Sequence, residues 1–234
     1  IRLSLVGSEM CIRDRLTPVN DFILRYRWQA FLLLGLIATY RMSDTVMGVM
    51  ANVFYIDQGF TKDQIAGVSK IFGLIMTLLG AGMGGLLIVR FGILPILFIG
   101  GAASAGTNLL FLMLADMGPN LKMLIVTISL DNFSSGMATS AFVAYLSSLT
   151  NLKFSATQYA LLSSIMLLLP RLIGGYSGVM VEKFGYHDFF LITAILGVPT
   201  LILIAIHWFQ ESRRAGPKPE PESSANSTAV GEES

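Results

Sequence analysis

Five charged side chains lie inside long apolar stretches of this sequence, where an ionised group is costly. They are Arg41, Asp44, Lys70, Asp131 and Arg171. Charges at membrane depth are tolerated when they pair with one another or face a water-filled cavity, so they indicate a path for a solute or an ion. Three cations against two carboxylates leave an excess of positive charge, which suits a ligand that bears carboxylates. Alternatively, each charge could belong to an ion pair that only fixes the register of the helices.

The spacing of these residues assigns each a candidate role. Arg41 and Asp44 are three residues apart, so they share one helix face and can neutralise each other. Asp44 and Asp131 are the only carboxylates inside the apolar stretches, so they are the candidates for proton coupling. The predicted substrate-binding residues are Arg41, Lys70, Arg171 and Asn132.

The sequence contains none of the usual arrangements for catalysis. It has no Ser-His-Asp set, no metal-ligand spacing, no phosphate-binding loop and no nucleotide fingerprint. We therefore expect no enzyme activity, no cofactor and no metal. A net charge of +1 also gives no electrostatic reason to expect a nucleic-acid partner.

The composition predicts an all-α membrane protein. Hydrophobic residues make up 53% of the chain and charged residues only 13%, whereas soluble proteins carry about 25% charged residues. A helix needs roughly 20 apolar residues to cross the hydrocarbon core. Six stretches meet this need: Trp28–Phe54, Lys62–Val89, Ile93–Ala115, Leu121–Leu149, Ala156–Val181 and Phe189–Phe209.

Around this bundle, residues 28–210, the sequence divides into three further segments. Residues 1–15 resemble a translated sequencing adapter, since 5–14 read LVGSEMCIRD, and we exclude them together with the only cysteine. Residues 16–27 are a predicted cytoplasmic linker. Residues 211–234 are rich in Pro, Glu and Ser, which predicts a disordered cytoplasmic tail. We expect native sequence from Leu16 and a missing portion before it.

Positive charges in the short loops predict the orientation. With the N-terminal side in the cytoplasm, seven cations lie on that side: Arg25, Arg27, Arg90, Lys153, Arg213, Arg214 and Lys218. Three lie on the other side: Lys62, Lys122 and Lys183. Because cytoplasmic loops carry the excess of Lys and Arg, both termini are predicted to be cytoplasmic.

Two segments are repeated along the chain. Phe60–Gln64 (FTKDQ) is echoed by Phe154–Gln158 (FSATQ), and Gly85–Gly92 (GLLIVRFG) by Gly178–Gly185 (GVMVEKFG). The first pair shares the capping-box form Ser/Thr-x-x-Gln. Each offset corresponds to three helices, an odd number, so the copies cross the membrane in opposite directions. A three-plus-three inverted repeat is typical of one half of a major facilitator transporter.

The segment Gly85–Gly92 also resembles the loop motif of that superfamily, Gly-x-x-x-Asp-Arg-x-Gly. Gly85, Arg90 and Gly92 are the matching residues, and they form the predicted gating loop. Val89 stands where the acid is usual, so a charge relay through this loop is in doubt. Anchoring of the helix ends by Arg90 is the safer interpretation.

Several blocks resemble the anhydromuropeptide permease (AmpG) family. They are Gly136–Leu146 (GMATSAFVAYL), Phe154–Ser164 (FSATQYALLSS), Tyr40–Asp44 (YRMSD) and Phe54–Phe60 (FYIDQGF). The resemblance covers about Trp28 to Phe209 and is most specific between the fourth and fifth helices. Some family members have Pro where Val53 stands, so this chain departs from the family at the outer end of the first span.

This resemblance implies a proton-coupled importer of GlcNAc-anhydroMurNAc peptides that serves peptidoglycan recycling in the bacterial inner membrane. Family members carry like charges at the positions of the five buried ions. The chain would then be the C-terminal six helices of a twelve-helix transporter, and the missing N-terminal half would supply the other wall of the cavity. Two alternatives remain: a permease of the same superfamily for acetyl-CoA or a siderophore, and a structural membrane protein without cargo.

Overall fold

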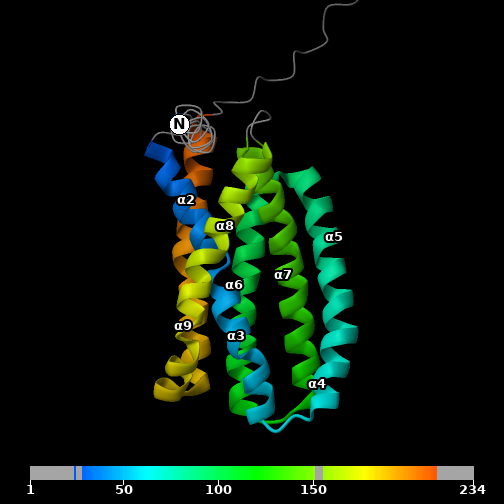
Figure 1. Ribbon diagram of the computed structural model, residues 1–234. Coiled ribbons are helices and arrows are strands. Elements are labelled where there is room, and N and C mark those ends of the chain that lie inside the picture. The colour runs from blue at the N-terminus through cyan, green and yellow to red at the C-terminus, as the bar shows by residue number, and fades with distance from the viewer. Residues whose placement is uncertain (1–23, 25–27, 151–154, 215–234) are drawn as a thin grey trace, which may run out of the picture.

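The protein is a bundle of helices that pass back and forth along one common direction (Figure 1). In this computed structural model, residues 24, 28–150 and 155–214 are described, and within them the regular structure is helical. The predicted adapter-derived segment, the predicted linker apart from Leu24, and residues 215–234 of the predicted tail lie outside the described residues.

The first two passes are each interrupted near a predicted site residue. α2 (Trp28–Tyr40) and α3 (Met42–Asp57) form the first pass, with a break at Arg41, whose φ is −94° and ψ 6°. The second pass comprises α4 (Lys62–Val68), the π-helical turn η1 (Ser69–Gly73) and α5 (Leu74–Phe91). Thr61 and Gln64 form the predicted capping box at its start.

The third and fourth passes are single helices close to their predicted bounds, α6 (Ile93–Met117) and α7 (Leu121–Leu149). The Asn120 side chain begins α7 by accepting the backbone N–H groups of Lys122 and Met123. Because a helix rises 1.5 Å per residue, the 25 and 29 residues are long enough to cross a bilayer.

The prediction of one continuous fifth span, Ala156–Val181, is wrong at its C-terminal end. α8 (Ser155–Gly174) stops seven residues earlier, and α9 (Ser177–Arg214) follows after a short turn. The glycine pair Gly174–Gly175 accounts for the stop, because glycine is a poor helix former. α9 itself bends at Gly185 and runs to Arg214, beyond the predicted start of the tail.

Five segments are long and apolar enough to cross a membrane: Gln29–Asp57, Lys62–Phe91, Ile93–Met117, Ala156–Gly174 and Ser177–Glu211. α7 is long enough but is not among them, since it carries a run of polar side chains from Asp131 to Ser140. It packs against both α5 and α6, so the side chains of this run are buried or half-buried, except that of Thr139, which is exposed. The protein is therefore a multi-pass membrane protein, and α7 is its remaining crossing.

Glycines let α5 approach α7 closely. A Cβ on Gly80 would lie 2.0 Å from the backbone oxygen of Phe133, and one on Gly136 would lie 2.3 Å from that of Thr77. A Cβ on Gly84 would also meet Ser140. Small residues at Gly80, Gly84 and Gly136 thus allow the close helix packing that is common in membrane proteins.

The predicted repeat has a counterpart in the backbone. Gly92, which ends the first copy, has φ 89° and ψ 172°, and Gly185, which ends the second, has φ 78° and ψ 172°. Only glycine adopts this region readily. The turn after α5 and the start of α9 lie at opposite ends of the bundle, as an inverted repeat requires (Figure 1).

Candidate functional site

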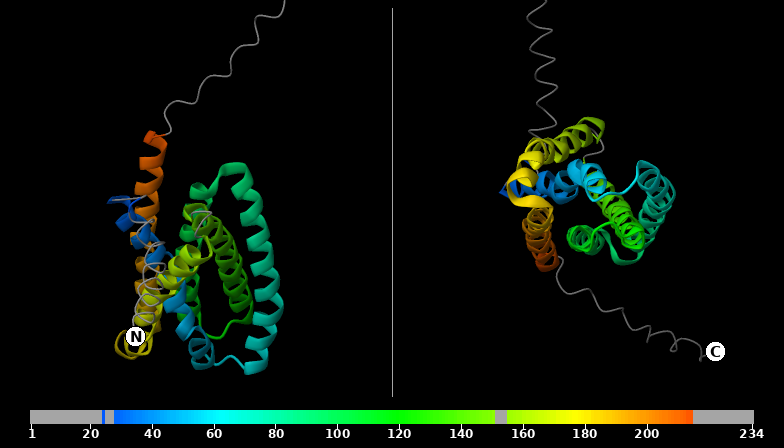
Figure 2. Two further views of the ribbon diagram at one scale, coloured as in Figure 1. Left: turned by 45° about the horizontal axis from the view of Figure 1, so that its top comes forward. Right: turned by 90° about the horizontal axis from the view of Figure 1, so that it is seen from below.

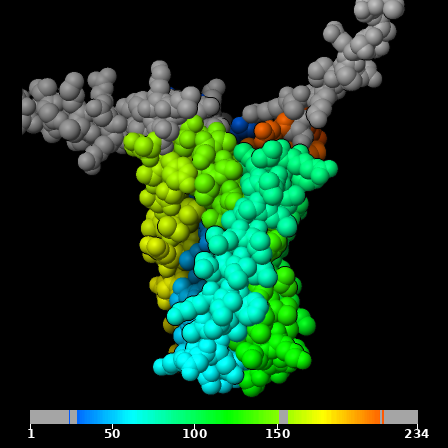
Figure 3. Space-filling view, turned by 90° about the vertical axis from the view of Figure 1, so that its right-hand side faces the viewer, coloured from blue at the N-terminus to red at the C-terminus, as the bar shows by residue number. Residues whose placement is uncertain are grey.

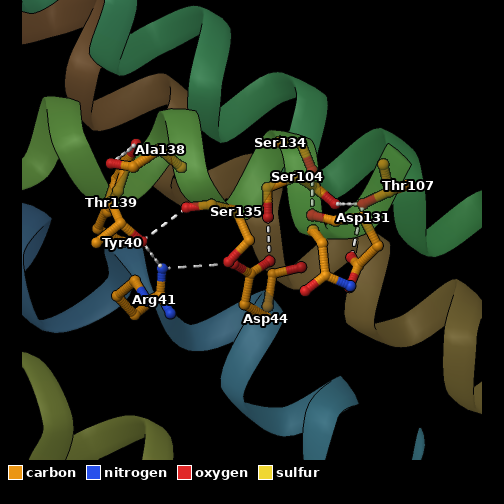
Figure 4. A network of polar contacts seen from close by, with 12 residues as sticks. Tyr40, Arg41, Asp44, Ser104, Thr107, Asp131, Ser134, Ser135, Ala138 and Thr139 are labelled. Atoms are coloured by element: carbon orange, nitrogen blue, oxygen red, sulfur yellow. Dashed lines mark hydrogen bonds and ion pairs between the residues drawn. The ribbon is translucent and has the colours of Figure 1, made fainter. Parts of the chain in front are cut away.

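A polar group from α3, α6 and α7 lies in the middle of the bundle (Figure 4). On one side of it is an apolar cluster that includes Leu36, Leu97 and Phe142, and on the other is a cluster that includes Phe54 and Phe111. The group is therefore enclosed along the bundle by two water-excluding layers.

Tyr40 fixes the chain where α2 ends. Its buried ring stacks on Phe142 with centroids 4.5 Å apart, and its hydroxyl contacts the backbone oxygens of Leu97, at 3.2 Å, and Ala138, at 3.3 Å. These contacts tie the break between α2 and α3 to α6 and α7. The next residue, Arg41, is thereby held against α7.

Arg41 and Asp44 form the predicted pair on one helix face. Arg41 Nη1 lies 3.8 Å from Asp44 Oδ2, and the two side chains are 24% and 13% exposed. The same nitrogen donates a 2.8 Å hydrogen bond to Thr139 Oγ1 of α7. Thr139 in turn donates to the backbone oxygen of Ser135, at 2.6 Å. The guanidinium thus links a carboxylate of α3 to a hydroxyl of α7.

Two hydroxyls of α6 contact the two carboxylates. Ser104 donates to Asp44 Oδ1, and Thr107 donates a 3.1 Å hydrogen bond to Asp131 Oδ1 (Figure 4). Ser104 and Thr107 are three residues apart, so they share one face of α6. Asp44 and Asp131, which are 87 residues apart in sequence, are joined to neighbouring turns of one helix.

The two carboxylates differ in their electrostatic surroundings. Asp44 has the Arg41 guanidinium as a partner, whereas Asp131 makes no ion pair within the described part of the chain. A carboxylate in a low-dielectric site is costly unless a cation or a proton neutralises it. Of the two carboxyls, only Asp44 has a cation within ion-pair distance among the described residues.

Asn132, beside Asp131, points to a different neighbour. Its Oδ1 accepts from Thr77 of α5 at 3.1 Å, and its Nδ2 donates to the backbone oxygen of Ile128 at 2.8 Å. The Thr77 hydroxyl also lies 2.8 Å from the backbone oxygen of Gly73, the last residue of η1. Asn132 thus supports the π-helical turn that carries Lys70, and it is not joined to the Arg41 group by any described contact.

Lys70 and Arg171 stand apart from the network. Both are exposed, and among the described residues neither makes an ion pair or a side-chain hydrogen bond. Their elements, η1 and α8, lie on opposite sides of α3 (Figure 2), and the space-filling view shows the surface hollowed between them, over α3 (Figure 3). Because an exposed cation in a spanning helix avoids lipid, these two side chains require water, a ligand or another part of the protein beside them.

The predicted gating loop lies at the junction of α5 and α6. Arg90 stands 5.5 Å from the ring centroid of Phe91, and Val89, in the place of the usual acid, is 89% exposed. A Cβ on Gly85 would meet nothing within 4 Å. Gly92, with its positive φ, makes the turn, and a gating role for the loop stays a prediction.

Sequence reasoning did not assign roles to Tyr40, Ser104, Thr107 or Thr139. The spacing of Ser104 and Thr107 was a usable signal, because two hydroxyls three residues apart, followed by Asn108, interrupt a long apolar run. No comparable signal marks Thr139, whose role depends on which helix lies opposite Arg41.

Comparison with known proteins gives one family for the chain. Residues 32–232 match the Major Facilitator Superfamily. A protein named AmpG 4 of Rickettsia conorii is 36% identical over 203 residues, which are 87% of this chain and 49% of that protein. AmpG 1 of Rickettsia felis is 35% identical over 185 residues, 79% of this chain and 42% of that protein.

The anhydromuropeptide permease of Escherichia coli K12 is 34% identical over 190 residues, 81% of this chain and 38% of that protein. The chain thus spans less than half the length of each of these relatives. The family match covers most of the chain and agrees with the helices described here. The chain belongs to the Major Facilitator Superfamily and is AmpG-like within it.

Proposed function

We propose that this chain is the C-terminal half of a proton-coupled importer of anhydromuropeptides, GlcNAc-anhydroMurNAc peptides destined for peptidoglycan recycling. The relatives named AmpG and anhydromuropeptide permease support the substrate class. Transport of a small molecule across a membrane follows from the family. The substrate, the proton and the completing N-terminal half are the proposed parts.

The observation that carries the proposal is the unequal pairing of the buried ions. Asp131 has a hydroxyl donor but no ion-pair partner among the described residues, which supports it as the residue that takes up a proton, with Asp44 as the alternative. Lys70 and Arg171 have no described partner, which supports them, with Arg41, as receivers of substrate carboxylates. Asn132, whose amide already bonds within the protein, supports the substrate site by holding η1 against α7.

We assign the protein to the bacterial inner membrane with both termini in the cytoplasm. The loop cations support this orientation. Single cysteines at positions 90 and 122 test this orientation. Each is probed from outside the cell with a maleimide that does not cross membranes. Labelling of Lys122→Cys alone is expected, and labelling of Arg90→Cys alone would reverse the orientation.

The full-length protein in vesicles tests the function. Labelled anhydromuropeptide should accumulate when a proton gradient is imposed and should stop accumulating when the gradient is collapsed. Unlabelled muropeptide should compete, whereas acetyl-CoA and a siderophore should not. If only acetyl-CoA or only the siderophore competes, that compound is the substrate class instead. If uptake does not depend on the proton gradient, transport is not proton-coupled.

A further inference from the structure

Thr107 has more hydrogen-bond acceptors than it can serve at once. Its hydroxyl lies 2.8 Å from the backbone oxygen of Ser104 and 3.1 Å from Asp131 Oδ1. The side chain is buried, with 7% of its surface exposed. A hydroxyl has one proton to donate. The group must therefore favour one of the two acceptors.

The protonation state of Asp131 decides which acceptor is favoured. An ionised carboxylate accepts a charge-assisted bond, about twice as strong as a neutral one, so it draws the Thr107 hydroxyl. A protonated carboxyl has a donor of its own and can give it to Thr107 Oγ1. The Thr107 hydroxyl then donates to the backbone oxygen of Ser104. Thr107 keeps its proton in both states and only changes the direction in which it donates.

The second acceptor lies within the backbone of α6. Threonine hydroxyls that bond to a carbonyl of the preceding turn bend helices slightly. Ser104, which holds that carbonyl, also binds Asp44 through its side chain. A change at Thr107 therefore acts on the turn of α6 that contacts α3, and Asp44 there is paired with Arg41.

We propose that Thr107 is a positioning residue whose hydroxyl switches between Asp131 and the Ser104 carbonyl as Asp131 loses and gains a proton. The switch transmits the protonation of a carboxyl on α7 to the packing of α6 against α3. The inference rests on the proposed function only in taking Asp131 as the group that binds the proton.

Matched substitutions in the full-length protein isolate the hydroxyl. Thr107→Val removes it and keeps the shape, and Thr107→Ser keeps it. Thr127→Val is the control, because Thr127 is fully buried and its hydroxyl has no partner among the described residues. Two transport readouts are compared: accumulation driven by a proton gradient, and exchange of labelled for unlabelled muropeptide without a gradient.

We expect T107V to lower driven accumulation at least about tenfold, as loss of a hydrogen bond to a charged group implies, while exchange stays within about twofold. T107S should restore accumulation, and T127V should change neither readout. If T107V lowers driven accumulation and exchange in proportion, or lowers neither, the proposed switch is overturned. Thr107 would then contribute only to packing.

Infrared difference spectra of the purified full-length protein after a pH jump give a readout without substrate. The carbonyl band of protonated Asp131 is identified by its absence in Asp131→Asn. The band should move to higher frequency in T107V, or in Thr107→Ala if the valine variant does not insert, and should return in T107S. If the frequency of this band is the same in the wild type and in all three variants, the inference is overturned.

The two assays fail separately. If the wild-type protein moves no muropeptide, the proposed function fails, and the infrared band still decides whether Thr107 senses Asp131.

Discussion

The charges inside the apolar helices fall into two regions that cannot be told apart from the sequence alone. Arg41, Asp44 and Asp131 lie in a network whose hydrogen bonds come from α6 and α7. Lys70 and Arg171 are exposed and have no partner within the described chain. A charge in an apolar helix is thus the same sequence signal in two different cases. In one, hydrogen bonds and an ion pair within the protein largely satisfy the charged groups. In the other, two cations have no such partners among the described residues.

This difference separates two tasks that a transporter must perform. We propose that the enclosed network, in which Arg41 pairs with only one of two carboxylates, responds to a proton, because adding one changes the charge balance of the whole network. The unpaired cations on η1 and α8 would instead respond to an anionic ligand. Substitutions in the two regions should therefore change different kinetic quantities.

Loss of the Asp131 carboxyl should have the largest effect. In the full-length protein, Asp131→Asn keeps the size and the Thr107 contact but removes the titrating group. We expect driven accumulation of labelled anhydromuropeptide to be abolished, with exchange and membrane expression retained. Asp63→Asn, at the exposed start of α4, is the control. Undiminished accumulation in Asp131→Asn would remove this residue from proton coupling.

The unpaired cations should affect substrate affinity next. Lys70→Gln and Arg171→Gln each remove a donor for a substrate carboxylate, so KM should rise about tenfold to a hundredfold with a smaller change in the maximal rate. Lys122→Gln, at the start of α7, is a matched control outside the hollow. Initial rates over a range of substrate concentrations decide the point. A lower maximal rate at unchanged KM would contradict a binding role.

A double-mutant cycle on Arg41 and Asp44 should show a smaller and compensating effect. Breaking a buried ion pair costs about 3–5 kcal/mol when one charge is left alone, and less here because Arg41 is partly exposed. We expect Arg41→Gln and Asp44→Asn each to lower the thermal stability, and the double variant to recover most of the loss.

Transport distinguishes the roles of Arg41 within this cycle. If Arg41 also receives substrate, the double variant stays poor in transport although it is stable. Full recovery of both stability and uptake would make the pair purely structural and restrict substrate binding to Lys70 and Arg171.

Much of the helix arrangement was predictable from the sequence, because the apolar length of a segment depends on local composition. The Arg41–Asp44 pair was also predictable, since it follows from spacing along one helix. The partners of Asp44 and Asp131 were not, because Ser104 and Thr107 contact them only once α6 lies between α3 and α7. The end of α8 at Gly174 was missed because the apolar run continues past the glycine pair.

Substitutions where α5 packs against α7 should have the smallest effect on transport. Gly80→Ala would set a Cβ 2.0 Å from the Phe133 oxygen, whereas a Cβ on Gly82 meets nothing within 4 Å. Overpacking of this kind costs roughly 1–3 kcal/mol, so G80A should lower the melting temperature of the purified full-length protein, and G82A should not. Because Lys70 lies on the pass that would be displaced, G80A should also raise KM slightly. An unchanged melting temperature in G80A would mean that α5 is free to shift, and Lys70 would then not depend on α7 for its position.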